Sequence, residues 1–246
     1  MAAEAVSDRP WLRALQEPVG NTMSPICTGT SVVALTFEGG VAIAADTLAS
    51  YGKLARYKNV SRLYSVNDKT LLGVLGDYAD YQFLKTIIET KQSELKCVDP
   101  KMDLSPVALH NWLTAVLYNR RSRFNFLWNT YLIGGVHGED KKPYLGVVNK
   151  IGVSYTNPFI ATGVGAYIVQ HTLEKEYQKR KDQGKMMSRE EALSLLEKCL
   201  EVLYYSDCQA HNTFEIGIVT AKGCEILPKK SIVGEWKMAE TAGSYE

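Results

Sequence analysis

The stretch that decides the fold is Thr28-Gly-Thr-Ser-Val-Val-Ala-Leu-Thr-Phe-Glu-Gly-Gly-Val-Ala-Ile-Ala-Ala-Asp46. Its part from Thr30 to Phe37 is rich in β-branched and aromatic residues, and Val41 to Ala45 is a second short apolar run. The residues Glu38-Gly-Gly40 between these runs are typical of a turn. The stretch therefore predicts an antiparallel hairpin with a three-residue loop.

The rest of the chain groups its strands and helices in blocks. Apolar and β-branched runs predict further strands at about 55–60, 63–66, 70–75, 130–136, 144–149, 152–155, 214–220 and 224–227. A period of 3.6 predicts helices from residue 77 to Lys96, from Ser105-Pro106 onward, from Tyr167 to Lys181, and from Ser188 to Leu203. Strands and helices are grouped in blocks and do not strictly alternate along the chain. This order favours an α+β protein in which paired helices pack on antiparallel sheets.

The predicted domain organisation is one folded unit with two flanking segments. Residues 1–27 show neither the alternation of a strand nor the 3.6-residue period of a helix, so they predict an irregular N-terminal extension. Residues 28–233 form the expected domain, with the last hairpin ending near Leu227, and residues 234–246 form a C-terminal tail. The tail carries Trp236, whose burial would stabilise a contact by about 2–3 kcal/mol, so it predicts a docking segment or a fold-back onto its own domain.

Composition excludes several classes of protein. The 246 residues include 28 basic and 27 acidic side chains, so there is no overall basic footprint for nucleic acid. No stretch approaches the ~18 consecutive apolar residues of a membrane span. Five scattered cysteines, an odd number, indicate reduced thiols in an intracellular protein.

Motifs for metals and cofactors are incomplete. Cys208 and His211 have C-x-x-H spacing, but no second ligand pair lies near them in sequence. Gly163-Val-Gly165 begins a dinucleotide fingerprint, whose third glycine is absent. We therefore expect neither a metal nor a cofactor.

Thr30 is the remaining candidate for chemistry. Its hydroxyl is a poor nucleophile unless a base takes its proton, and an N-terminal amine can serve as that base. Such chemistry requires a cut between Gly29 and Thr30, with Asp46 at the end of the return strand nearby. The other explanation is that Thr30 occurs here because threonine has a high strand propensity.

The hairpin stretch resembles the opening of proteasome beta subunits. Further segments of the chain fit later motifs of that family in order: Leu72-Gly-Val-Leu-Gly-Asp-Tyr-Ala-Asp-Tyr-Gln82, Ala161-Thr-Gly-Val-Gly-Ala166 and Tyr205-Ser-Asp207. Within the family, Tyr118-Asn-Arg-Arg121, Asn125-Phe-Leu-Trp-Asn-Thr130 and Val202-Leu-Tyr-Tyr205 are most similar to the non-catalytic branch at the seventh ring position. The resemblance implies the N-terminal-nucleophile hydrolase fold, a four-layer αββα sandwich.

The resemblance also implies a degenerate site. Active members use a threonine, an aspartate and a lysine, for which this chain has Thr30, Asp46 and Arg62. Two serines of active members correspond to Val164 and Ala210, while the late aspartate is kept as Asp207. Because arginine does not deprotonate in proteins and two hydroxyls are missing, we expect no catalytic residue.

The function implied is that of a structural subunit in the inner beta rings of the 20S core particle. The expected partners are neighbouring beta subunits, the alpha ring, the opposite beta ring through the tail, and indirectly the regulatory particle, with no nucleic acid and no membrane. The expected setting is ubiquitin- and ATP-dependent proteolysis in cytoplasm and nucleus. The alternative is an active threonine endopeptidase that uses Thr30.

Overall fold

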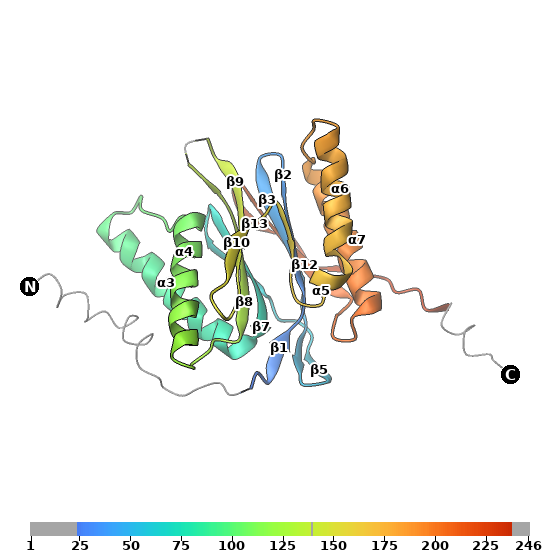
Figure 1. Cartoon of the computed structure of the whole chain (residues 1–246), viewed down its shortest axis with the longest axis horizontal. Helices are drawn as coiled ribbons and strands as arrows, with labels where there is room; N and C mark the ends of the chain where they lie inside the picture. Colours follow the sequence, from blue (N-terminus) through green and yellow to red (C-terminus); the bar gives the residue numbers. More distant parts are fainter. Residues whose placement is uncertain (1–23, 139, 238–246) are drawn as a thin grey trace, which may run out of the picture.

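Two antiparallel sheets packed face to face form the centre of the molecule, and helices cover both outer faces (Figure 1). The computed structural model describes residues 24–138 and 140–237. Helices α3 and α4 cover one sheet, and α5, α6 and α7 cover the other (Figure 1). This arrangement confirms the predicted α+β sandwich of four layers.

The first sheet has the strand order β10-β9-β8-β7-β1-β4-β5, and β6 also pairs with β7. Its strands are β1 (Cys27–Gly29), β4 (Ala49–Tyr51), β5 (Leu54–Tyr57), β6 (Leu63–Asn67), β7 (Thr70–Asp77), β8 (Asn129–His137), β9 (Lys142–Val148) and β10 (Ser154–Thr156). The second sheet has the order β11-β2-β3-β12-β13, and β14 also pairs with β12. Its strands are β2 (Val32–Phe37), β3 (Gly40–Asp46), β11 (Phe159–Ala161), β12 (Thr213–Thr220), β13 (Gly223–Ile226) and β14 (Lys230–Ser231).

The helices are α3 (Tyr78–Val98), α4 (Pro106–Ser122), α5 (Gly165–Ile168), α6 (Gln170–Asp182) and α7 (Arg189–Ser206). Ser105 caps α4 through a hydrogen bond from the Ala108 N–H, as the Ser105-Pro106 signal predicted. Ser188 and Glu191 form the predicted capping box of α7. Asp77 ends β7 and caps α3, so a single carboxylate joins a strand to a helix.

Three apolar cores separate the four layers. Val32, Ile43 and Leu132 belong to the core between the sheets. Leu84 and Leu113 belong to the core under α3 and α4, and the third core lies under α6 and α7. Strands β2 and β3 are buried along their whole length because both of their faces contact a core, which explains why they read as continuous apolar runs.

Four details of the sequence prediction are wrong. The first hairpin has a two-residue turn, because Phe37 pairs with Gly40 and Gly39 takes a φ of 81° that favours glycine. The helix predicted from Tyr167 to Lys181 is two helices, since the regular helix is interrupted at Val169, which is buried in the core. The last predicted hairpin ends at Ile226, close to the predicted Leu227, but the strand that follows it was not predicted. The final two-residue strand β14 pairs with β12, and the Ile232 N–H donates to the Asn212 carbonyl oxygen.

The fourth wrong detail is the omission of three short strands, which have too few residues to show an alternating pattern. Strands β1, β4 and β11 have three residues each and were not predicted. Among them, β1 begins at Cys27, within the segment expected to be irregular. It lies between β4 and β7 and hydrogen-bonds to both.

The start of the tail folds back onto the domain. The Trp236 ring lies 5.8 Å from the Tyr204 ring and 5.3 Å from the Tyr205 ring, measured between centroids, and remains 50% exposed. The Glu235 N–H donates to the Tyr205 hydroxyl at 3.0 Å. The rest of the tail, from residue 238, and the extension up to residue 23 lie outside the described residues.

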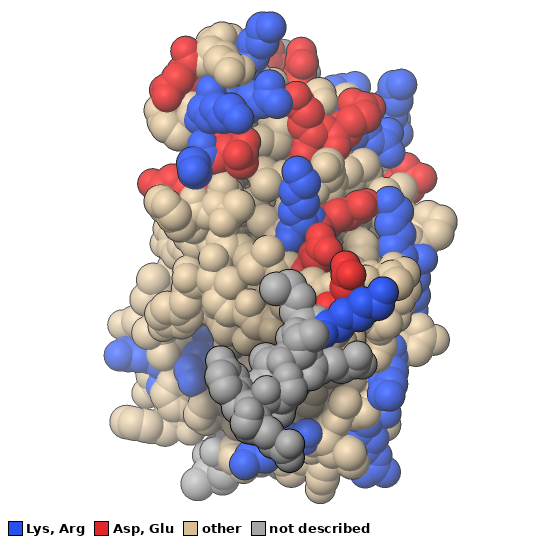
Figure 2. Space-filling view, turned by 90° about the vertical axis from the view of Figure 1, so that its right-hand side faces the viewer, with Lys and Arg blue, Asp and Glu red and all other residues tan. Residues whose placement is uncertain are grey.

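Charges of both signs crowd the upper part of the face that carries α6 and α7 (Figure 2). Several are paired, such as Arg180 with Glu191 at 2.6 Å and Lys179 with Glu176 at 3.9 Å. This is the composition of a solvated surface, and the cations in the last turn of α6 also complement its helix dipole. Within the described part of the chain, no helix combines the length and apolarity needed to cross a membrane.

Candidate functional site

Thr30 lies at the junction between β1 and β2, and it is only 9% exposed. Its hydroxyl donates to Oδ2 of Asp207 at 2.5 Å, although the two residues are 177 positions apart. Asp207 is the residue that ends α7, so the helix layer delivers this carboxylate to the sheet edge. The backbone nitrogen of Thr30 is an amide bonded to Gly29 and not an amine.

The segment that precedes Thr30 is fixed on both edges. Thr28 pairs with Ser50 of β4 on one side and with Asp77 of β7 on the other. The Ile26 N–H also donates to the Asp77 carboxylate at 3.2 Å. Strand β1 is therefore an integral strand of the eight-stranded sheet.

Arg62 is buried, and its side chain uses all five of its N–H donors within the protein. Nε donates to the Asp46 carbonyl oxygen at 3.1 Å. Nη1 donates to the carbonyl oxygens of Thr30 and Val74. Nη2 donates to the Ser31 carbonyl oxygen at 3.1 Å and to the Asp46 carboxylate. The guanidinium thus ties the β1–β2 junction to β3 and β7, and none of these bonds goes to the Thr30 hydroxyl.

Close packing explains why glycine precedes Thr30. A Cβ on Gly29 would lie 2.4 Å from Cδ of Arg62, so any larger residue would displace the arginine side chain. The same packing keeps water away from the ion pair between Arg62 and Asp46, whose side chains are 3% and 5% exposed.

Asp46 accepts three hydrogen bonds. Arg62 donates one to its carbonyl oxygen and one to its carboxylate, and the His211 N–H donates to Oδ2 at 2.9 Å. Burial raises the pKa of the Asp46 carboxyl, while the positive charge of Arg62 and the His211 N–H oppose that rise. A buried ion pair of this kind is costly to break, because removing one partner leaves the other charge without compensation.

His211 is neutral at this site. The Thr213 N–H donates to its Nδ1 at 3.1 Å, so Nδ1 carries no proton. Burial lowers the pKa of His211, and the nearby charge of Lys58 acts in the same direction, whereas Asp46 raises it. The C-x-x-H spacing with Cys208 therefore has a structural explanation, in which His211 supports a turn.

Glu215 is a buried part of the cluster that the sequence analysis did not identify. Its Oε1 accepts from the Ser61 hydroxyl and from the Arg62 N–H, the latter at 3.2 Å. A lone acid inside the apolar strand Phe214-Glu-Ile-Gly-Ile-Val219 was the available signal, since a buried carboxylate needs a partner. Ser31 was also missed, and its hydroxyl accepts from the Gly165 N–H at 2.9 Å.

The structure brings four of the six predicted residues together: Thr30, Asp46, Arg62 and Asp207 are linked by the hydrogen bonds above. Val164 immediately precedes α5 and its side chain is 43% exposed. Ala210 follows α7 and its N–H donates to the Asp207 carbonyl oxygen at 3.0 Å. Neither side chain has a group that could join a proton network.

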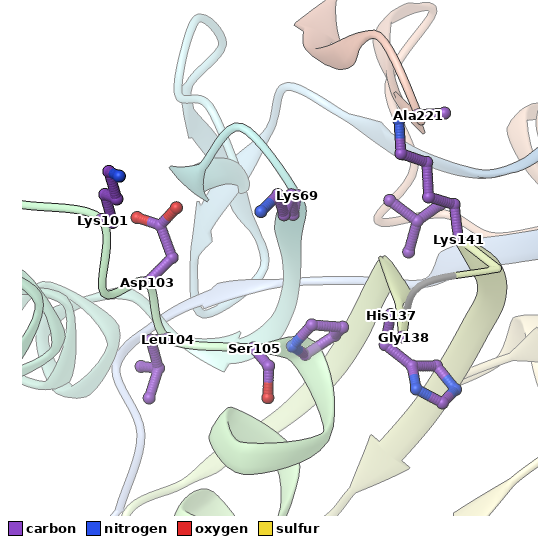
Figure 3. Close-up of a pocket in the computed structure, with 11 residues that line it drawn as sticks. Lys69, Lys101, Asp103, Leu104, Ser105, His137, Gly138, Lys141 and Ala221 are labelled. Atoms are coloured by element: carbon purple, nitrogen blue, oxygen red, sulfur yellow. The ribbon is translucent and has the colours of Figure 1, made fainter.

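A hollow of the described surface lies elsewhere (Figure 3). It has a volume of about 280 Å³, and its lining includes Lys69, Lys101, Lys141 and Ala221. In the register of β3 with β12, Asp46 pairs near one end and Gly40 near the other, next to Ala221. The hollow is therefore at the end of the sandwich opposite the Thr30 cluster.

Among residues 24–138 and 140–237, no three His, Cys, Asp or Glu side chains are grouped so that they could hold a metal ion. Thr30 is 9% exposed, its backbone nitrogen is bonded to Gly29, and its hydroxyl is hydrogen-bonded to Asp207.

Comparison with known proteins gives a consistent family. Residues 26–219 match the family model described as proteasome subunit. The chain is 45% identical over 229 residues to proteasome subunit beta type-4 of Xenopus laevis, covering 93% of this chain and 92% of that protein. It is 35% identical over 237 residues to proteasome subunit beta type-4 of Arabidopsis thaliana, covering 95% and 93%.

A third relative has a different subunit number in its name, type-7 in place of type-4. The chain is 37% identical over 228 residues to a probable proteasome subunit beta type-7 of Schizosaccharomyces pombe, covering 93% of this chain and 86% of that protein. These names confirm the resemblance predicted from the hairpin stretch and the later motifs. This chain belongs to the proteasome subunit family, among its beta subunits.

Proposed function

We propose that this chain is a non-catalytic structural subunit of the 20S proteasome core particle. Membership of the family implies assembly with other proteasome subunits in rings. The subunit would close an inner beta ring and form part of the chamber wall, and neighbouring subunits would supply the peptidase activity.

One observation carries the proposal: Thr30 is held as an internal residue of the chain. Strand β1, directly before it, is paired with both β4 and β7. An N-terminal nucleophile would require cleavage after Gly29, which would remove this strand from the middle of a sheet. The unpaired backbone groups of β4 and β7 would then need new partners.

The chemistry around the hydroxyl supports the same conclusion. A lysine ammonium beside a hydroxyl can shed its proton, whereas the Arg62 guanidinium cannot. Arg62 donates to the carbonyl oxygen of Thr30 and not to its hydroxyl. Val164 and Ala210 contribute no hydroxyl. Catalytic groups that act together do not make independent contributions to the rate, so an enzyme that lacks several of them is not merely slowed by one small factor.

The wider setting belongs to the proposal as well. The subunit would contact neighbouring beta subunits and the alpha ring, and serve ubiquitin- and ATP-dependent proteolysis in cytoplasm and nucleus, with the regulatory particle as an indirect partner. A half-exposed Trp236 on Tyr204 and Tyr205 would orient the following tail residues toward the opposite beta ring. Deletion of residues 234–246 should lower the resistance of complete particles to splitting by salt, and unchanged resistance would contradict this role of the tail.

The proposal is tested on particles purified through a tag on this chain. We expect the tagged chain to sediment with alpha and beta subunits, and to remain unlabelled by a threonine-directed epoxyketone that labels other beta subunits in the same sample. The labelled neighbours are the internal control for the probe. Covalent modification of Thr30 would establish the alternative, a threonine endopeptidase.

A further inference from the structure

The hollow at the end of the sandwich opposite Thr30 gathers positive charge. Its volume is about 280 Å³, and three lysines belong to its lining, so we call it the lysine hollow: Lys69, Lys101 and Lys141. They come from the turn between β6 and β7, the connection between α3 and α4, and the turn between β8 and β9. Figure 3 shows Lys101 on one side, Lys69 in the middle and Lys141 on the other side. The fold, and not a run of basic sequence, therefore brings the three lysines together.

The three ammonium groups are available to a ligand. Within the described part of the chain, none of them has an ion pair or a hydrogen-bond partner. Two other lysines close to them in the sequence are paired, since Nζ of Lys96 lies 4.0 Å from Asp103 and Nζ of Lys142 lies 3.1 Å from Asp140. The unpaired lysines are thus the ones that line the hollow.

Asp103, the one acid among the described lining residues, does not balance this charge. It lines the hollow together with the three lysines, which leaves an excess of two positive charges. Its carboxylate already accepts a hydrogen bond from Nε2 of Gln92 at 3.0 Å and pairs with Lys96. Like charges gathered in one place repel one another, and an anion bound among them would relieve that repulsion.

Hydrogen bonds hold the walls of the lysine hollow in place without a ligand. The Lys69 N–H donates to Oδ1 of Asn67 at 2.9 Å, and Nδ2 of the same asparagine donates to the Leu104 carbonyl oxygen at 2.9 Å. The Val136 N–H donates to the Lys69 carbonyl oxygen at 3.1 Å. These bonds join the turn that carries Lys69 to the α3–α4 connection on one side and to β8 on the other.

The start of α4 forms another wall. A Cβ on Gly135 of β8 would lie 2.8 Å from Cβ of Pro106, so the first turn of α4 packs directly on the strand. The positive end of the helix dipole adds to the potential of the three lysines. Lys141 has a φ of 49°, a conformation in which glycine or asparagine is preferred. The geometry of its turn therefore does not account for a lysine at this position.

The composition of the lining indicates the chemistry of the ligand. Lysine ammonium groups bind phosphate as compact point charges, and a phosphoryl group that carries up to two negative charges matches the excess of two positive charges. The described lining contains no Phe, Tyr or Trp, so an aromatic base would find no such ring to stack on. Ligand pockets begin at about 300 Å³, so the hollow suits a compact ligand.

We propose that the lysine hollow binds a small, non-aromatic ligand that carries one or two phosphoryl groups. The inference goes beyond the proposed function, because it requires neither membership of a ring nor any property of Thr30. It assigns a binding site to the end of the sandwich that the Thr30 cluster does not occupy.

Protection of lysines from acetylation tests the site with pyrophosphate as the probe. The sample is the purified particle that contains this chain, or the full chain alone if no particle forms, so failure of the proposed function would be seen separately. Peptide mapping by mass spectrometry should show that millimolar pyrophosphate slows acetylation of Lys69, Lys101 and Lys141 several-fold. Lys175, which is exposed on α6 in the other helix layer, should react at an unchanged rate.

Three outcomes of this experiment would overturn the inference. The first is equal acetylation with and without pyrophosphate. The second is the same protection by sodium chloride at equal ionic strength, which would show screening and no site. The third is protection by a phosphoserine peptide and not by pyrophosphate, because the phosphoryl group would then have to come from a protein and not from a small molecule.

Substitution of two neighbouring lysines supplies a matched pair. Lys141 lines the hollow, whereas Lys142 is paired with Asp140, and both lysines are exposed, so neither Lys141→Gln nor Lys142→Gln should impair folding. In calorimetric titrations with pyrophosphate, we expect Lys141→Gln to raise Kd roughly tenfold, the usual loss for one charge-assisted hydrogen bond. Lys142→Gln should leave Kd unchanged. A wild-type Kd for Lys141→Gln, or an equal rise in both variants, would overturn the inference.

Asp103→Asn changes the charge of the lining in the opposite direction. It removes the negative charge and keeps an oxygen that can accept from Gln92. The variant should therefore bind pyrophosphate more tightly than the wild type. An unchanged or weaker affinity would contradict the assignment of the hollow to an anion.

Discussion

The Thr30 cluster and the exposed end of α4 are opposite kinds of region. In the cluster, polar groups are buried and satisfied by one another, down to all five donors of Arg62. At the end of α4, the Phe124 side chain is 82% exposed, and its backbone has a φ of 55°, a conformation that disfavours a side chain. The comparison indicates that the polar groups around Thr30 are used within the fold, whereas the fold does not bury the Phe124 ring.

The largest expected effect comes from breaking the cluster. Arg62→Ala should destabilise the chain by about 3–5 kcal/mol, because it leaves the Asp46 carboxylate buried without its partner. The measurement is urea unfolding of the dilute chain, followed by tryptophan fluorescence. Arg121→Ala, which removes an exposed arginine, is the control and should stay within about 0.5 kcal/mol of the wild type.

Arg62→Lys sharpens this prediction. A lysine keeps the positive charge for Asp46 but offers three donors on a narrower group, so stability should fall between the wild type and Arg62→Ala. Wild-type stability would show that the planar arrangement of five donors is unimportant, and would count against a structural role for the arginine.

A smaller effect is expected from acid at His110, which is buried between α4 and β9. Its Nε2 donates to the Val147 carbonyl oxygen at 3.0 Å, and Nδ1 accepts from the Tyr144 hydroxyl at 2.6 Å. Burial lowers the pKa of His110. The unfolded chain, with a histidine pKa of about 6.5, then binds more protons than the folded chain.

The free energy of unfolding should therefore fall as the pH drops below about 6.5, and should be flat with respect to this group above about pH 7.5. His211 has a lowered pKa and contributes with the same sign. Comparing the wild type with His110→Gln isolates the part due to His110. Identical pH profiles for the two proteins would contradict the assignment.

The smallest effect is expected at Thr30. Thr30→Ala removes one hydrogen bond to Asp207 and should cost about 1 kcal/mol of stability. The peptidase activities of particles that contain the variant should be unchanged, because the hydroxyl is not a nucleophile in this account. Loss of one peptidase specificity, with normal particle yield, would break the contrast between the two regions.

The sequence predicted those parts of the fold that rest on local signals. Period and capping residues gave the hairpin, the starts of α4 and α7, and the sandwich class. Strands β1, β4, β11 and β14 were not predicted, because two or three residues are too few to show a period and because these strands form only by pairing with other strands. Local propensity cannot report such pairings.

The candidate site divides in the same way. Thr30 and Asp46 were candidates from the hairpin itself, and Arg62 and Asp207 came from the resemblance to a family. The hydrogen bonds from Ser61 and Arg62 to Glu215 span more than 150 positions of sequence, so only the fold reveals them. The direction of the Arg62 donors, toward the carbonyl oxygen of Thr30, also follows from packing around Gly29 and not from residue types.

The start of the chain inside the assembled particle tests the central claim most directly. Intact mass and N-terminal sequencing of this chain from purified core particles should show a start upstream of Ile26, because Ile26 and strand β1 are bound to Asp77 and β4. The claim of a non-catalytic subunit predicts that result. A chain that begins at Thr30, with a free amine beside its hydroxyl, would contradict it.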